Sequence, residues 1–390
     1  MTGIFEDGTK SQEASNPGSP ASPQPPSPAN LVRPELRRLK AYHLVQGPSR
    51  FKLDQNEVAW DLPLRIKKRC VDRLMQESWA TYPTFNADEF RKALGEHYDW
   101  PWEGVLAGAG SSELLSICVE SMCPPMGEVI SHTPSFGLYS MLVPRSGGTP
   151  RFLQAGSDLA LPMEALMAEV EKDPRRPVIL CSPNNPVGDA ATVEQVEALL
   201  QRLEGPLLLD NAYHEFSRYD YRPLLDRYRH LVLLRTLSKA WSVAGLRLGY
   251  MLADPELVAE LVKAKLPYNL GHPSVAAGLA VLSEPAVSER AVGTILRRRP
   301  QWEELLQQAG FETFPTETNF VLLRCGTDDG AQGRSEVLRQ GLSDRGILVR
   351  DVSAGPGLRG CLRVTVGGGG ALRAFRRALD EMGYLAGGRV

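Results

Sequence analysis

Short, continuous apolar runs recur along the middle of the chain and predict strands that are buried on both faces. Residues 178–181, 207–209 and 231–234 are such runs, and each is too short for a buried helix. Between the first two runs, residues 192–203 have the apolar spacing of a helix. Strands that alternate with helices predict a mainly parallel sheet wrapped by helices, so we expect an α/β fold.

The last third of the chain has a different pattern, which predicts a smaller α+β domain. At 390 residues the chain exceeds the usual size of a single core, so more than one domain is expected. Residues 17–30 are dense in Pro and Ser and carry no large apolar side chain, which predicts disorder. We therefore expect a disordered tail at 1–30, an N-terminal segment at 31–75 that joins the small domain, a large ligand-binding domain at 76–275 and a small domain at 276–390.

Composition excludes several classes of function. A net charge of −2 argues against a nucleic-acid-binding protein that relies on a basic surface. The six cysteines form no CxxC pair and no spacing typical of a metal site, so we expect no metal and a reducing, cytoplasmic location. The chain has no apolar run of about 18 residues and no secretory signal, so we expect no membrane association.

Polar residues that carry chemistry follow the predicted strands. Asn185, Asp210 and Lys239 each lie at the carboxyl end of an apolar run or just beyond it. Ligands of parallel α/β sheets bind at this edge, so we expect the three side chains to share one site.

Lys239 has the surroundings of a reactive amine. It lies between two apolar runs and near Arg247, and both features favour the neutral amine, which can attack a carbonyl and form a Schiff base. Thr236, Ser238 and Arg247 are the groups that a phosphate prefers. A ligand that joins an aldehyde to a phosphate is pyridoxal phosphate. A Ser-Lys pair alone is also typical of a solvated loop, so the interpretation depends on the rest of the chain.

A second stretch predicts an anion site. Gly110 precedes Ser111 and Ser112, which open an apolar helix, so free backbone N–H groups and two hydroxyls gather at a helix N-terminus. By itself this pattern is also typical of a simple helix cap.

The remaining needs of a pyridine cofactor have candidates as well. A carboxylate such as Asp210 keeps the ring nitrogen protonated, so that the ring draws electrons. Asn185 and Tyr213 are candidates to bind the ring oxygen, and Phe136 is a candidate to stack on the ring.

Three motifs carry a resemblance to a known family. Residues 182–188 (Ser-Pro-Asn-Asn-Pro-Val-Gly), 209–213 (Leu-Asp-Asn-Ala-Tyr) and 235–240 (Arg-Thr-Leu-Ser-Lys-Ala) resemble the signatures of fold-type I pyridoxal-phosphate-dependent aminotransferases. More narrowly, the chain is similar to the histidinol-phosphate aminotransferases over roughly residues 33–385. The narrower likeness rests on residues 33–42, 53–57, 82–83, 347–351 and 361–367.

The resemblance implies a function and a set of roles. The enzyme would transaminate histidinol phosphate with 2-oxoglutarate or glutamate in histidine biosynthesis, with Lys239 as the catalytic residue that holds the cofactor. It would be a homodimer in which Tyr82 reaches the cofactor phosphate of the neighbouring subunit. The other cofactor-binding residues would be Gly110, Ser111, Ser112, Phe136, Asn185, Asp210, Tyr213, Thr236, Ser238 and Arg247, and the substrate-binding residues would be Tyr42, Asn56, Arg350 and Arg363.

Some positions depart from the family pattern. Val187 stands in place of Thr, Asn211 in place of Glu, Phe136 in place of Tyr, Ser112 in place of Asp, and residues 58–59 (Val-Ala) in place of Asn-Pro. The last change lies near the expected substrate entrance. An aromatic amino-acid aminotransferase, a decarboxylase of a phosphorylated amino acid and a non-catalytic cofactor-binding protein therefore remain alternatives.

Overall fold

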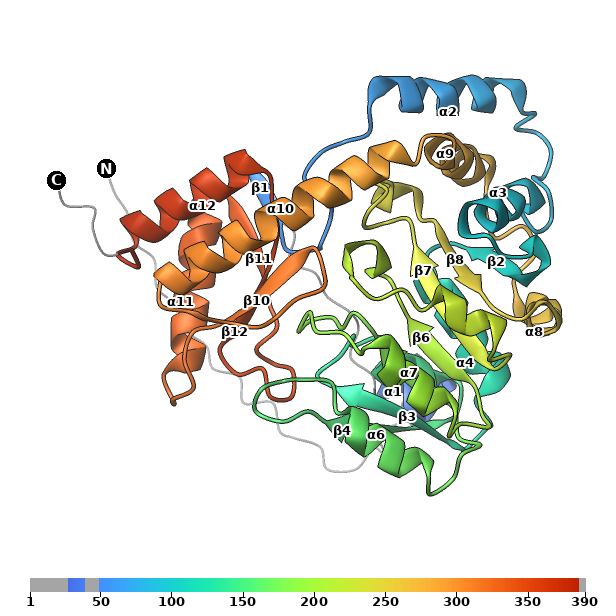
Figure 1. The fold of residues 1–390 in the computed structure, drawn as a ribbon, viewed down its shortest axis with the longest axis horizontal. Helices are drawn as coiled ribbons and strands as arrows, with labels where there is room; N and C mark the ends of the chain where they lie inside the picture. Colours follow the sequence, from blue (N-terminus) through green and yellow to red (C-terminus); the bar gives the residue numbers. More distant parts are fainter. Residues whose placement is uncertain (1–26, 39–48, 386–390) are drawn as a thin grey trace, which may run out of the picture. The chain divides into compact units, whose positions relative to one another are not determined.

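The structure is a computed structural model that describes residues 27–38 and 49–385 (Figure 1). Most of the predicted tail at 1–30, and Tyr42, lie outside the described residues. A first unit carries two short helices, η1 (Pro28–Leu31) and α1 (Pro34–Arg37), each of which begins with a proline. Residues 43–390 form a second, compact unit, which contains the sheets and the site described below.

The larger sheet of this second unit has seven strands in the described residues, in the order β2-β8-β7-β6-β5-β3-β4. All neighbouring strands are parallel except at β8, which is antiparallel to both β7 and β2. The mainly parallel sheet was thus predicted correctly. Its strands are β2 (Val105–Gly108), β3 (Glu128–Thr133), β4 (Thr149–Gln154), β5 (Val178–Cys181), β6 (Leu207–Asp210), β7 (Leu231–Thr236) and β8 (Gly249–Leu252).

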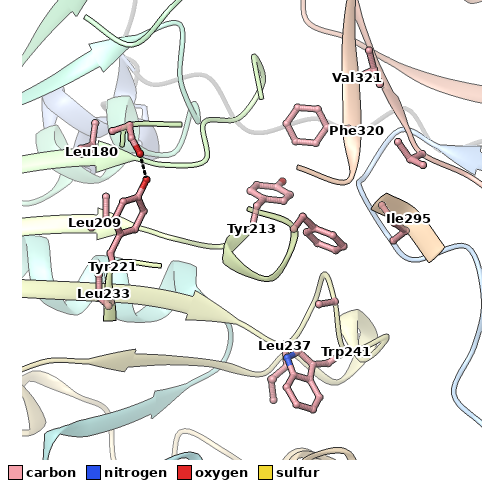
Figure 2. Close-up of a cluster of buried hydrophobic side chains, with 14 of the residues drawn as sticks. Leu180, Leu209, Tyr213, Tyr221, Leu233, Leu237, Trp241, Ile295, Phe320 and Val321 are labelled. Atoms are coloured by element: carbon pink, nitrogen blue, oxygen red, sulfur yellow. Dashed lines mark hydrogen bonds between the residues drawn. The ribbon is translucent and has the colours of Figure 1, made fainter. Parts of the chain in front are cut away.

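Helices cover both faces of this sheet, which is why its central strands are continuously apolar. Leu180, Leu209 and Leu233 are register partners on β5, β6 and β7 and lie on one face (Figure 2). That face packs on α3 (Asp88–Tyr98), α6 (Met163–Val170) and α7 (Val193–Leu200). The opposite face packs on α4 (Ser111–Met122), α5 (Tyr139–Arg145) and α8 (Pro255–Leu261). Each of the central strands β5, β6 and β7 therefore buries side chains in both directions.

A second sheet joins the two ends of the unit. Its order is β1-β11-β12-β10-β9, and β1 is parallel to β11 while the other pairs are antiparallel. The domain boundaries predicted at 75/76 and 275/276 stay predictions. The strands are β1 (Phe51–Leu53), β9 (Glu312–Thr313), β10 (Phe320–Arg324), β11 (Ile347–Asp351) and β12 (Cys361–Thr365), and the accompanying helices are α10 (Ala286–Gln308), α11 (Ala331–Asp344) and α12 (Gly369–Glu381).

The remaining helices connect these layers. They are α2 (Leu64–Gln76) and α9 (His272–Leu282), together with the 3₁₀ helices η2 (Trp102–Gly104), η3 (His214–Phe216), η4 (Arg222–Asp226), η5 (Ala244–Leu246) and η6 (Val262–Ala264). None of the helices in the described ranges has the length and the apolar character that a membrane crossing requires.

Two side chains extend the pairing between β3 and β5. The backbone ladder joins Ile130 to Val178. Beyond that point Ser131 Oγ donates to the carbonyl of Ile179 (2.9 Å), and the backbone N–H of Cys181 donates to Nε2 of His132 (3.2 Å). His132 is buried and serves as an acceptor, so its ring must be neutral, and burial lowers its pKa to about 3.

His132 should make the fold less stable as the pH falls. Its folded pKa lies below the unfolded value of 6.5, so below pH 6.5 the unfolded state takes up a proton that the folded state does not bind. Between pH 7.5 and 5.5 the wild type should lose about 1.4 kcal/mol more free energy of unfolding than His132→Gln, which keeps an acceptor but does not titrate. Urea unfolding at both pH values measures this difference, and equal losses would contradict it.

Candidate active site

Lys239 lies in a tight turn between β7 and β8. Thr236, the last residue of β7, donates from Oγ1 to the carbonyl of Leu248 (3.1 Å) and accepts the backbone N–H of Ser238 (3.1 Å). Its hydroxyl therefore fixes the start of the turn. Because β7, β6 and β5 are parallel, Lys239 emerges at the same sheet edge as Asp210 and the turn that holds Asn185.

The amine of Lys239 is surrounded by groups that favour its neutral form. Its Nζ donates to the backbone carbonyl of Gln55 (2.9 Å), which carries no charge. The pKa of Lys239 is lowered to about 7, mainly by burial and also by the positive charge of Arg363, while Glu57 opposes the shift. A substantial fraction of the amine is thus available as a base or nucleophile near neutral pH.

Asp210 is the last residue of β6, and only one oxygen of its buried carboxylate has a hydrogen-bond partner among the described residues. Its Oδ2 accepts a hydrogen bond from the hydroxyl of Tyr139 (2.8 Å), and its Oδ1 is buried without a hydrogen-bond partner among the described residues. Burial raises the pKa of Asp210 to about 6, against the opposing effect of the Tyr139 bond. A cationic N–H donor placed against Oδ1 would restore the ionised form.

Arg363 is oriented by both ends of its guanidinium. Nη1 donates to Oδ1 of Asn185 (2.5 Å), and Nη2 donates to the backbone carbonyl of Asp54 (2.7 Å). The side chain also lies over the ring of Phe320, 5.2 Å from its centroid. Arg363 therefore links the turn after β5, the segment after β1 and the second sheet.

Asn56 and Tyr213 form a second link across the site. Nδ2 of Asn56 donates to the hydroxyl of Tyr213 (2.8 Å), and its backbone N–H donates to Oγ1 of Thr365 (3.0 Å). The ring of Tyr213 meets that of Phe320 edge-on (Figure 2). The centroid of the Tyr213 ring lies 6.0 Å from Nζ of Lys239. Burial raises the pKa of Tyr213 to about 12, so its hydroxyl stays protonated as a donor.

The residues of the predicted anion site lie at the start of α4. Arg247 Nη1 lies 3.4 Å from Oγ of Ser238, and a Cβ on Gly110 would come within 2.6 Å of Nη2 of Arg247. Gly249 lets β8 approach the helix start, because a Cβ there would lie 2.2 Å from the backbone nitrogen of Ser111. Ser112 follows Ser111 in the first turn of α4. Arg247, Ser238 and the N-terminal N–H groups of α4 thus lie close together at the start of this helix, as an anion site requires.

These features fit pyridoxal phosphate. The unsatisfied Oδ1 of Asp210 matches a protonated ring nitrogen, the amine of Lys239 matches an aldehyde, and the α4 start matches a phosphate. All three arise at one edge of the large sheet.

Other predicted residues lie around this centre. Phe136 contacts Tyr139 edge-on, with ring centroids 5.9 Å apart. Arg350 on β11 is the register partner of Arg363 on β12. Tyr82 is instead an exposed side chain that stacks on Tyr268 (4.4 Å between centroids), and no contact joins it to Lys239 within the described part of this chain.

Two of the departures have a structural account. Val187 packs in a buried apolar cluster with Leu159, Phe314 and Leu322, where a hydroxyl would need a partner. Residues 58 and 59 line a cavity of about 330 Å³ that also reaches Ser238, so this change lies beside the anion site.

Sequence reasoning missed three contributors to the site. Tyr139 lies in an apolar helix, α5, where a buried tyrosine hydroxyl was the signal that a polar partner is needed. Gln55 and Asp54 act through backbone carbonyls, which have no signature in the side-chain pattern.

Comparison with known proteins agrees with this geometry. The family described as aminotransferase class I and II matches residues 49–381. The chain is 32% identical to a histidinol-phosphate aminotransferase of Caldanaerobacter subterraneus subsp. tengcongensis over 353 residues, 90% of this chain and 99% of that protein. It is 34% identical to one of Chlorobaculum parvum over 340 residues, 86% of this chain and 94% of that protein.

Solved structures share the fold. The histidinol-phosphate aminotransferase of Sinorhizobium meliloti in complex with pyridoxal-5'-phosphate has a TM-score of 0.78 at 24% identity, covering 90% of this chain and 96% of its own. The L-threonine-O-3-phosphate decarboxylase of Porphyromonas gingivalis has a TM-score of 0.72 at 21% identity, covering 85% of this chain and 99% of its own.

The amine of Lys239 should be unusually reactive in the cofactor-free protein. An amine-reactive reagent should modify it with a rate that rises through about pH 7. Arg363→Gln should move this profile to higher pH, because it removes a positive charge that favours the neutral amine. Mass spectrometry of modified peptides measures both profiles, with Arg359→Gln, an exposed arginine paired with Asp329, as the matched control. An unchanged profile in Arg363→Gln would contradict this electrostatic role.

Proposed function

The chain belongs to the class I and II aminotransferases, which depend on pyridoxal phosphate, and we propose that it transfers the amino group of histidinol phosphate to 2-oxoglutarate in histidine biosynthesis. The curated relatives named histidinol-phosphate aminotransferase support this choice of substrate. The described cysteines are all free, which supports the cytoplasm as the compartment.

The observation that carries the substrate assignment is a pair of arginines. Arg350 and Arg363 are direct partners on the antiparallel strands β11 and β12, so their side chains leave the same face of the sheet about 5 Å apart at Cβ. Two arginines paired in this way suit an anion with several oxygens, such as a phosphate or a carboxylate. A donor with a phosphate and an acceptor with carboxylates would use the same pair in turn.

The residues at the sheet edge supply the acid–base chemistry. When bound, pyridoxal phosphate supplies an aldehyde for amine exchange and a ring that withdraws electrons from the substrate α-carbon. Lys239 Nζ, with its pKa of about 7, would take the proton from that carbon as a general base. Asp210, oriented by Tyr139, would hold a proton between its Oδ1 and the ring nitrogen.

Several binding roles follow for the remaining residues. Asn185 and Tyr213 would donate to the ring oxygen, and Phe136 would cover the ring. The cofactor phosphate would be held at the start of α4 by Ser111, Ser112, Ser238 and Arg247. Gly110 and Thr236 would set the backbone conformation of the two segments that carry these residues. Asn56 would complete the substrate side, and the substrate-binding role expected for Tyr42, which lies outside the described residues, stays a prediction.

The alternative functions that the sequence leaves open differ from this proposal in the substrate or in the bond that breaks. The same fold occurs in a decarboxylase as well as in aminotransferases, so the fold does not separate them. No contact in the described residues favours decarboxylation. An aromatic aminotransferase binds a donor without a phosphate and would need no second arginine for it. The donor preference measured below for Arg350→Ala therefore distinguishes an aromatic aminotransferase from a histidinol-phosphate aminotransferase.

We also propose a homodimer with shared sites. A run of exposed apolar side chains on and after α2, including Met75, Trp79 and Tyr82, continues onto Leu266 and Tyr268. Exposed apolar surface of this extent is typical of protein–protein interfaces. Tyr82 would reach the cofactor phosphate of the partner from this face.

Mixing two inactive variants tests the shared site. Lys239→Ala removes the amine of a subunit's own site, whereas Tyr82→Ala removes a residue lent to the partner. After unfolding and refolding of an equal mixture, half the dimers should be hybrids with one intact site, so about a quarter of wild-type activity should return. Mixtures as inactive as the separate variants, with hybrids verified by a tag, would contradict the proposal.

Arg350→Ala should change specificity more than catalysis. A charge-assisted contact is worth about 1.5–3 kcal/mol, so kcat/KM for histidinol phosphate should fall roughly 10- to 150-fold. Turnover of an unphosphorylated aromatic amino acid should change much less. Steady-state kinetics with both donors measures this; equal losses would make Arg350 structural, and a wild-type preference for the unphosphorylated donor would indicate an aromatic aminotransferase.

A further inference from the structure

Asn211 stands immediately after Asp210 and joins three strand ends. Its Nδ2 donates to the backbone carbonyl of Ser182, just beyond β5 (2.8 Å), and its Oδ1 accepts from Nε of Arg235 on β7 (3.0 Å). Its own backbone N–H donates to the carbonyl of Leu234 (2.8 Å). The residue is fully buried, so these bonds cannot be replaced by bulk water.

Each of the three strand ends carries part of the site. Ser182 lies three residues before Asn185, Asn211 follows Asp210, and Arg235 lies four residues before Lys239. At this level the backbone N–H of Ser182, just beyond β5, donates to the carbonyl of Asp210, the last residue of β6 (3.0 Å). The side chain of Asn211 thus extends the alignment of β5, β6 and β7 one residue further, to where the functional turns begin.

An amide matches the partners that surround Asn211 in this chain. It must donate to a carbonyl on one side and accept from a cation on the other, which an ionised carboxylate cannot do. Arg235 is itself buried, with Asp220 at 3.4 Å and the ring of Tyr98 at 5.2 Å as further partners. The exposed carboxylate of Asp220 supplies the negative charge, which leaves Asn211 free to act as a two-sided hydrogen-bonding link.

We propose that Asn211 is a positioning residue for the reaction, whose amide holds the Asn185 turn, Asp210 and the Lys239 turn in register. This inference rests on the proposed transamination. Groups that act through geometry affect turnover strongly, because displacements near 1 Å at the reacting atoms cost up to about 100-fold in rate.

Asn211→Asp tests the donor to Ser182 with almost no change in shape. At pH 8.5 the carboxylate lacks the donor, so kcat should fall about 10- to 100-fold while KM for histidinol phosphate changes less than about twofold. The Kd for pyridoxal phosphate should rise in parallel.

Asp220→Asn is the control, because it changes the charge beside Arg235 by one unit, in the opposite direction, and leaves the Asn211 amide intact. Its kcat should stay within about twofold of wild type. An equal loss of kcat in Asp220→Asn, or a kcat of Asn211→Asp that stays near the wild-type value, would overturn the proposal. If Asn211→Asp does not fold, Arg235→Lys removes the same Nε donor and should lower kcat at constant KM; unchanged kcat would overturn it.

A wild-type protein that fails to use histidinol phosphate would overturn the proposed function instead. The Kd for pyridoxal phosphate then still tests Asn211. A tenfold weaker Kd in Asn211→Asp, relative to Asp220→Asn, supports the positioning role, and equal Kd values overturn it.

Discussion

A buried amine that donates to a neutral carbonyl is the interaction on which the site depends. Removing an ammonium from water is unfavourable, so the environment of Lys239 shifts the amine toward its neutral form. The carbonyl of Gln55 satisfies the amine without restoring its charge, and Arg363 adds a repulsion that acts in the same direction. The segment after β1 and strand β12 are therefore both needed to create a reactive lysine on the large sheet.

The same burial acts on Asp210 in the opposite direction. Its pKa rises to about 6 while that of Lys239 falls to about 7, so burial moves both groups toward their neutral forms. A ligand with a cationic ring nitrogen on one side and an aldehyde on the other complements both groups at once. This pairing of opposite shifts is the physical reason why the edge formed by β5, β6 and β7 suits pyridoxal phosphate.

Much of this arrangement is predictable from local pattern. The apolar runs at 178–181, 207–209 and 231–234 became β5, β6 and β7, because strands covered on both faces must be apolar throughout. Residues that follow such strands converge at one edge, which places Asn185, Asp210 and Lys239 together. The second sheet was harder to predict, because β1 pairs with β11 almost 300 residues away.

The hydrogen bonds that the sequence did not predict join residues that are distant along the chain. The bond from Tyr139 to Asp210 and those from Asn211 to Ser182 and Arg235 join residues 24 to 71 positions apart. In the sequence, Asn211 was only a departure from the family pattern, with no role assigned to it. The structure shows a side chain that uses both its donor and its acceptor, so the meaning of the substitution lies in its neighbours.

The central claim is amine transfer from histidinol phosphate by the Lys239 site. A single-turnover reaction without any oxo acid tests it most directly, with the ketone product counted against protein chains. The account predicts about one ketone per active site from the wild type and none from Lys239→Ala. A wild type that forms no ketone, or a variant that forms as much as the wild type, would contradict it.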